Sequence, residues 1–121
     1  MKIVSLSENK NIEKRIAITP DIAKKYIDLG FQVSLSENYG SHLGIDDNLY
    51  NELGVKIIKN EKEILNDADL FIQLGLPSDE TLSFLKEGQS VIGVLNPYQN
   101  KDKLNELLKK KINLFSLKLL P

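Results

Sequence analysis

The stretch Val91-Ile92-Gly93-Val94-Leu95 is apolar at every position. Apolar residues on both faces are typical of a strand in the middle of a parallel sheet, where helices cover the two sides. Similar short apolar runs occur along the chain and alternate with longer segments of helical period, which predicts βαβ units. We therefore expect an α/β fold with a three-layer, doubly wound and mostly parallel sheet of about five or six strands.

Six segments carry the strand pattern, and the segments between them begin with helix-capping residues. The predicted strands are Lys2–Ser5, Gln32–Glu37, Lys56–Ile58, Leu70–Leu74, Ser90–Leu95 and Leu114–Leu117. A helix is predicted where a side-chain oxygen can accept a hydrogen bond from an amide of the first turn. The predicted caps are Thr19, which precedes Pro20, and Asp46, Asn60, Ser78 and Asn100.

Composition bounds the class of protein. The chain has 121 residues, which is enough for one compact domain but too few for the two domains of a complete dinucleotide-linked enzyme. Its net charge is −1, whereas a nucleic-acid binder needs a clustered excess of lysine or arginine. Without cysteine, and with His42 as the sole imidazole, neither a disulfide nor a metal site is expected. No apolar run approaches the ~20 residues that span a bilayer, so we expect a cytoplasmic domain without direct membrane insertion.

The seven glycines are scattered along the chain. A dinucleotide site needs clustered glycines, because backbone amides must approach the pyrophosphate closely at the start of a helix. The glycine spacing fits neither G-x-G-x-x-G nor the Walker pattern. We therefore expect no cofactor-binding residue within this chain and no redox catalysis by the chain alone.

Arg15 is the only arginine among 16 basic residues. A guanidinium offers a planar fork of donors that matches a carboxylate in a bidentate way, which a lysine ammonium cannot do. Three interpretations remain open at this stage. Arg15 contacts a ligand, or it pairs with Glu8 or Glu13, or it is a solvent-exposed residue.

Polar residues follow two of the predicted strands, where ligands of open α/β sheets bind. Gln73 closes one strand, and Asn96, Tyr98 and Gln99 follow the next. The amides can bind a carboxamide or a backbone group, and Tyr98 can stack on a flat ring. The alternative is that these residues only form turns, since Asn-Pro and Leu-Pro are common in loops.

Several of these stretches occur together in one known family. The segment Glu13-Lys14-Arg15-Ile16-Ala17-Ile18-Thr19-Pro20 is similar to the family motif E-x-R-V-A-x-[ST]-P, and Asn96-Pro97-Tyr98-Gln99-Asn100 follows at the expected distance. The chain resembles the N-terminal segment of the family that joins the alpha subunit of NAD(P) transhydrogenase to alanine dehydrogenase. The resemblance extends over essentially the whole chain, although Leu6-Ser7 stands where the family commonly has Pro-Lys.

Two positions distinguish the branches of this family. Alanine dehydrogenases carry a lysine in the segment aligned with residues 73–77 and a catalytic histidine at the position of Asn96. This sequence has neither residue, and a neutral asparagine cannot donate the proton that carbonyl reduction needs. The resemblance is therefore closer to the transhydrogenase alpha subunit, in which hydride passes between NADH and NADP⁺ while protons cross a membrane.

The resemblance implies a single N-terminal, substrate-side domain over residues 1–121, flavodoxin-like and similar to the catalytic domain of formate/glycerate dehydrogenases. In such a subunit NAD is bound by a following Rossmann domain, which is absent from this chain. The expected site residues therefore only line the cleft that this domain closes, and they are Arg15, Gln73, Asn96, Tyr98 and Gln99. Catalytic residues are not assigned.

The expected partners are that Rossmann domain, the NADP-binding and membrane segments, and a second copy of the chain, because the apolar run Leu114–Leu120 predicts an uncovered face. The assembled protein would lie in the cytoplasm, peripheral to the inner membrane. An alanine dehydrogenase-like domain, or a non-catalytic binding or assembly module of the same fold, is the alternative.

Overall fold

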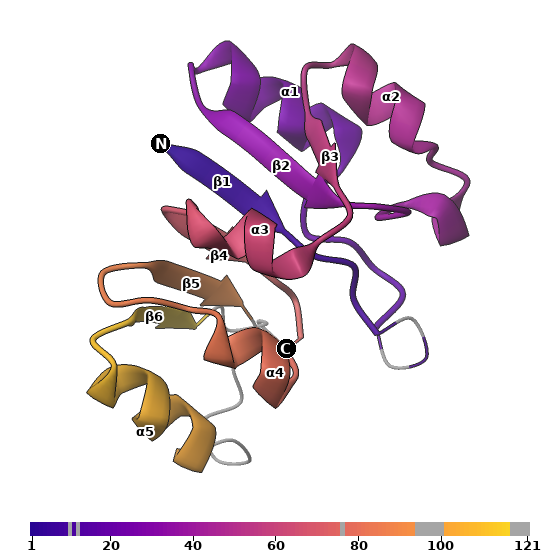
Figure 1. Cartoon of the computed structure of the whole chain (residues 1–121). Coiled ribbons are helices and arrows are strands. Elements are labelled where there is room, and N and C mark those ends of the chain that lie inside the picture. The colour runs from indigo at the N-terminus through magenta and orange to yellow at the C-terminus, as the bar shows by residue number, and fades with distance from the viewer. Residues whose placement is uncertain (10, 12, 76, 94–100, 117–121) are drawn as a thin grey trace.

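The computed structural model describes residues 1–9, 11, 13–75, 77–93 and 101–116. In these residues one sheet is formed by the strands β1 (Lys2–Ser5), β2 (Gln32–Ser36), β3 (Lys56–Ile58), β4 (Leu70–Ile72), β5 (Ser90–Gly93) and β6 (Asn113–Ser116), and all pairs are parallel. The helices are α1 (Pro20–Asp28), α2 (Asp47–Glu52), α3 (Glu61–Asn66), α4 (Asp79–Ser83) and α5 (Lys101–Lys109), with a 3-10 turn, η1 (Ser41–Leu43) (Figure 1). The predicted α/β class and the parallel sheet are confirmed.

The strands lie in the order β3-β2-β1-β4-β5-β6. Without β3, this is the flavodoxin-like order that the resemblance implies, and β3 extends the sheet by one strand beyond β2. The chain passes from β1 to β2 on one side and later returns to β4 on the other side. The point where the winding reverses therefore lies between β1 and β4, which is where open α/β sheets bind ligands.

Side-chain caps start the helices as the sequence predicts. Thr19 Oγ1 accepts from the amide of Ile22, and Pro20 occupies the first position of α1. Three further caps act in the same way at the starts of α2, α3 and α4, namely Asp46, Asn60 and Ser78. The predicted cap Asn100 lies outside the described residues. Local chemistry therefore fixes four helix starts.

The strand ends differ from the predicted ends. β4 stops at Ile72 rather than Leu74, because the amide of Leu74 binds the Glu8 carboxylate instead of a neighbouring strand. β2 ends at Ser36, and the chain then turns at Asn38, whose φ is 60°. β6 begins one residue early, since Asn113 pairs with Ser90. The predicted end of β5 lies outside the described residues.

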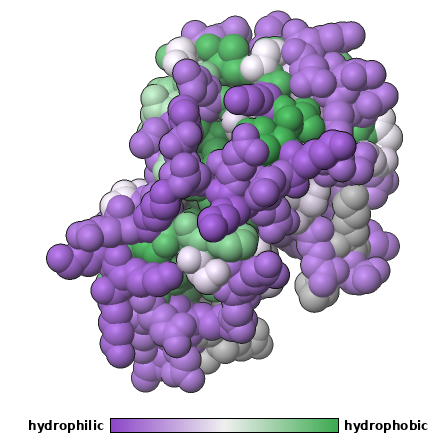
Figure 2. Space-filling view, viewed as in Figure 1, coloured by the Kyte–Doolittle hydropathy of each residue, from purple (hydrophilic) through white to green (hydrophobic). Residues whose placement is uncertain are grey.

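The two faces of the sheet are packed by different helices. We call the side of α1 and α2 the α1 face and the side of α3, α4 and α5 the α3 face. Neighbouring strand residues alternate between them, so Ile3 packs on the α1 face and Val4 on the α3 face. On the α3 face, Leu65, Leu82 and Leu107 of the three helices contact one core cluster. Figure 1 shows α3 and α4 in front of the sheet, and Figure 2 shows that hydrophilic residues cover most of that side.

Candidate functional site

A cleft of about 440 Å³ lies at the carboxyl ends of β1 and β4, where the winding of the sheet reverses. The loop after β1 forms one wall, and α3 and α4 form the other. The lining is mostly polar and contains Ser7, Glu8, Asn9, Glu61, Gln73, Ser78, Thr81 and Lys103, together with Leu6, Gly75 and Pro77. The position agrees with the predicted location of a site, while most of these residues were not predicted.

Gln73 closes β4 and is built into the fold. Its side chain is buried, and its Oε1 accepts from the Ser5 hydroxyl at 3.0 Å and from the Leu6 amide at 3.1 Å. Its Nε2 donates to the Leu6 carbonyl at 2.7 Å. Gln73 therefore joins the ends of β1 and β4, and its amide is already engaged by the protein itself rather than free to bind a ligand.

Tyr39 organises the neighbouring segment from a buried position. Its hydroxyl oxygen accepts from the amides of Ala17 and Ile18, each at 3.1 Å, and lies 2.9 Å from the Ser5 hydroxyl. Because Ser5 donates to Gln73, the Tyr39 hydroxyl is left to donate to Ser5. Burial raises the pKa of Tyr39, so it keeps the proton that this chain of hydrogen bonds requires. The segment that carries Arg15 is thereby tied to the end of β1.

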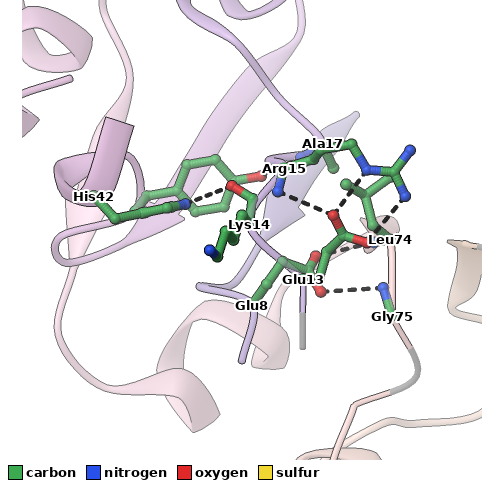
Figure 3. Close-up of polar contacts among 9 residues, drawn as sticks. Glu8, Glu13, Lys14, Arg15, Ala17, His42, Leu74 and Gly75 are labelled. Atoms are coloured by element: carbon green, nitrogen blue, oxygen red, sulfur yellow. Dashed lines mark hydrogen bonds and ion pairs between the residues drawn. The ribbon is translucent and has the colours of Figure 1, made fainter. Parts of the chain in front are cut away.

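The Glu8 carboxylate binds two consecutive backbone amides. Its Oε2 accepts from Leu74 at 2.9 Å and its Oε1 from Gly75 at 3.1 Å (Figure 3). Burial raises the pKa of Glu8, the two amides oppose that shift, and the negative charge of Glu13 adds to it. The cleft thus carries an internal carboxylate at the end of β4.

Arg15 pairs with Glu13 in a bidentate way. Its Nε donates to Oε1 at 2.8 Å and its Nη2 to Oε2 at 3.0 Å, while the Arg15 amide also donates to Oε1. The hydrogen bonds from Arg15 lower the pKa of Glu13 to about 2, and the carboxylate in turn raises the pKa of Arg15. The Arg15 side chain is 61% exposed. Of the three interpretations of Arg15, the structure favours the pair with Glu13.

The structure brings two of the predicted site residues to the same edge of the sheet. Gln73 lines the cleft, and Arg15 lies beside it through Glu13, which interacts with Glu8 (Figure 3). The other predicted residues, Asn96, Tyr98 and Gln99, lie outside the described residues. His42 is exposed, and its Nε2 lies 2.6 Å from the Lys14 carbonyl.

Sequence reasoning missed the roles of Glu8 and Tyr39. Glu8 could have been found from its place three residues after a strand at the centre of the sheet, where a carboxylate reaches the end of a neighbouring strand. Tyr39 gives no such signal, because its contacts come from residues 17, 18 and 5, which only the fold brings to it.

Four of the described helices begin with a side-chain cap. A pyrophosphate is held by amides at the start of a helix, and in α1, α2, α3 and α4 one or two of these amides bind the protein's own cap residue. Groups of three or more metal-ligating side chains are absent from the described part of the chain. That no residue of this chain binds a cofactor stays a prediction.

Comparison with known proteins gives one family. The family model described as alanine dehydrogenase/PNT, N-terminal domain, matches residues 5–121. An NAD(P) transhydrogenase alpha subunit of Rickettsia prowazekii is 36% identical over the whole chain, which spans 33% of that protein. Alanine dehydrogenase 1 of Staphylococcus aureus strain N315 is 29% identical over 84% of the chain and 27% of its own length. The chain thus spans about a third of the length of these relatives.

Solved structures agree on the fold. A transhydrogenase from Sinorhizobium meliloti superposes with a TM-score of 0.86 at 24% identity, over 98% of this chain and 36% of that one. An L-alanine dehydrogenase superposes with a TM-score of 0.88 at 17% identity, over 96% of this chain and 32% of that one. In both matches the matched region is about a third of a longer chain.

Proposed function

Because the chain belongs to the alanine dehydrogenase/PNT N-terminal domain family, we propose that it is the N-terminal part of the NAD(H)-binding alpha subunit of a proton-translocating NAD(P) transhydrogenase. In that protein hydride would pass between NADH and NADP⁺. The 36% identity to the Rickettsia prowazekii transhydrogenase subunit over the full chain supports this assignment. Under this proposal the chain is one component of an oxidoreductase, and the isolated chain is inactive by itself.

The pairing of the charges at the cleft favours the transhydrogenase branch over the alanine dehydrogenase branch. A keto acid would need free positive groups for its carboxylate, but the Arg15 fork is occupied by Glu13. Gln73 is neutral, and its amide is engaged by Ser5 and Leu6. This arrangement favours a supporting role over the binding of a small anionic substrate, which argues against the alanine dehydrogenase alternative.

NAD would be held by a Rossmann domain that follows this one, since the glycine spacing of this chain fits no dinucleotide motif. The strand ends of β1 and β4 would then form one wall of the cleft between the two domains. Arg15 and Gln73 would act as structural residues of that wall, and Asn96, Tyr98 and Gln99 are proposed as further cleft residues.

Part of the α1 face supports the proposal of further partners. Ile72, Ile92 and Phe115 pair across β4, β5 and β6 and form a row on that face. The first two are half-buried and Phe115 is 55% exposed, whereas α1 and α2 lie over β2 and β3. An apolar row of this kind indicates an interface. We place there a later part of the alpha subunit or a second copy of the chain in a dimer.

The same proposal concerns location. No described helix is long and apolar enough to cross a bilayer. In a transhydrogenase the domain would lie on the cytoplasmic side, peripheral to the inner membrane, while other segments of the protein carry the protons across. The competing proposal is a non-catalytic binding or assembly module of the same fold, and an experiment must distinguish it from a transhydrogenase subunit.

A chimera tests the function directly. This chain would replace the matching third of the Rickettsia prowazekii subunit, and the chimera would be combined with the remaining transhydrogenase subunits. We expect hydride transfer from NADH to an NADP⁺ analogue and no reduction of pyruvate with ammonia. Pyruvate reduction would support the alanine dehydrogenase alternative, and a folded, NADH-binding chimera without either activity would support the assembly module. The unmodified Rickettsia protein is the control.

A further inference from the structure

Two separate loops meet at the cleft through one carboxylate. The loop after β1 carries Glu8, and the segment after β4 carries Leu74 and Gly75, more than sixty residues away in sequence. Each oxygen of the Glu8 carboxylate accepts one of the two consecutive amides (Figure 3). These bonds join the segments that follow β1 and β4, beyond the point where Gln73 joins the two strand ends.

The local shape suits a carboxylate at this point. Gly75 has no side chain, and a Cβ at that position would lie 3.3 Å from Glu8 Oε1, which is tighter than an ordinary contact. A residue with a Cβ would therefore require the carboxylate oxygen to shift by a few tenths of an ångström. Hydrogen bonds with an ionised acceptor are about twice as strong as neutral ones, and a bidentate pair also fixes the geometry.

The charged groups around Glu8 leave these amides as its principal described partners. Arg15 is committed to Glu13 in the same loop, and Lys103 of α5 pairs with Asp79 at 3.1 Å. Glu61 of α3 lines the same cleft, and Tyr39 interacts with the Glu8 charge from the segment after β2. Within the described residues, Glu8 is therefore held by backbone N–H groups and the Gln73 amide rather than by a cation.

We propose that Glu8 is a positioning residue that latches the Leu74–Gly75 segment to the loop after β1 and so holds the two rims of the cleft at a fixed distance. This role concerns the chain itself and does not depend on the proposed function. It also goes beyond the cleft residues that the sequence indicated, since Glu8 binds no ligand in this role and acts through the backbone that it fixes.

The bonds between Glu8 and the two amides predict a measurable signature. If the two amides bind the Glu8 carboxylate, their proton chemical shifts must follow its ionisation. Burial and the charge of Glu13 raise the pKa of Glu8 above 4.5, so the midpoint should lie above that value. Both amides should report the same midpoint, because one group titrates.

Nuclear magnetic resonance of the 121-residue chain tests this. In the unmodified chain we expect the amide protons of Leu74 and Gly75 to titrate together with a midpoint above 4.5. In Glu8→Gln that titration should disappear, and hydrogen exchange should accelerate about tenfold at the amide that loses its acceptor, because glutamine keeps only one acceptor oxygen. Glu8→Asp keeps the charge on a side chain that is one methylene shorter, so it should keep an amide titration that Glu8→Gln lacks.

The controls separate the latch from a general loss of structure. Glu52→Gln removes an exposed carboxylate at the end of α2 and should leave both amides unchanged. If neither amide titrates in the unmodified chain, the proposal is overturned. This test needs no variant, so it can be made even if Glu8→Gln fails to fold. Titration that persists in Glu8→Gln would also overturn it, because another acid would then be responsible.

Discussion

Two neighbouring rows of the sheet share their strands but not their surroundings. Phe71, Val91 and Leu114 pair across β4, β5 and β6 and point to the α3 face, where the first two are buried. The adjacent row of Ile72, Ile92 and Phe115 points to the α1 face, where the first two are half-buried and Phe115 is exposed. Both rows are equally apolar in sequence.

The difference lies in the helices rather than in the strands. On the α3 face, the described helices α3, α4 and α5 contribute to the cluster that covers the first row. On the α1 face, α1 and α2 cover β2 and β3. The second row is therefore as apolar as a core row. Within the described residues, however, the helices that cover this face do not reach β6. We interpret the first row as core and the second row as an interface.

The largest effect is expected from the covered row. Phe71→Ala should lower the free energy of unfolding by about 3–5 kcal/mol, because it removes a buried ring and leaves a cavity. Phe115→Ala should cost less than about 1 kcal/mol in the isolated chain, since that ring is half in water already. Urea unfolding of both variants checks the contrast, and equal losses would contradict it.

Tyr39 tests the covered part of the α1 face. Tyr39→Phe leaves the amides of Ala17 and Ile18 without their acceptor, so the free energy of unfolding should fall by about 1–3 kcal/mol. Tyr26→Phe is the matched control, because Tyr26 is a half-buried tyrosine of α1 on the same face. A loss for Tyr26→Phe as large as that for Tyr39→Phe would show that the hydroxyl network has no special role.

Association tests the open row. We expect the chain to self-associate at tens of micromolar through Phe115 and its neighbours, taking a dimer of about micromolar affinity as reference. Phe115→Lys should weaken this association about tenfold or more, since a charge would replace apolar contact. Leu29→Lys changes another exposed apolar residue, on the opposite half of the molecule, and serves as the control. A strictly monomeric unmodified chain in sedimentation experiments would remove the argument for a second copy.

The exposed Glu13–Arg15 pair should give the smallest effect. The pKa of Glu13 is depressed in the folded chain, so its contribution to stability is present above 4.5 and is lost as the pH falls toward about 2. Solvent screens this pair, so the contribution should be small. Arg15→Lys keeps the charge and loses the fork, which should move the Glu13 midpoint back toward 4.5 in a carboxyl titration. An unchanged midpoint would show that the bidentate geometry does not matter.

The regular part of the fold could be predicted because its signals are local. Capping residues such as Thr19 and Ser78 bind amides three residues later in the sequence, and short apolar runs predict the strands of a parallel sheet. The flavodoxin-like core order followed from the resemblance, while the place of β3 beyond β2 depends on tertiary packing. The predicted end of β4 was wrong, because Glu8 from a distant loop takes the amide of Leu74.

The candidate site could be predicted only in its position. Strand ends at the switch point follow from the winding of the sheet, and an acidic partner for Arg15 was among the open alternatives. The buried state of Gln73 could not be seen, because its partners Ser5 and Leu6 are more than sixty residues away. Glu8 itself has a partial signal, because it stands three residues after a central strand, but its partner amides of Leu74 and Gly75 carry no signature in a sequence.

One measurement tests the central claim, which is that the open row on the α1 face is an interface of a larger transhydrogenase subunit. The chain contains no tryptophan, so Phe115→Trp places a single reporter on β6. Fluorescence is then compared between the dilute isolated chain and the chimera with the Rickettsia subunit, after subtraction of the chimera that retains Phe115. We predict a water-exposed indole in the isolated chain and an emission maximum at shorter wavelength in the chimera. The same water-exposed emission in both proteins would contradict the claim.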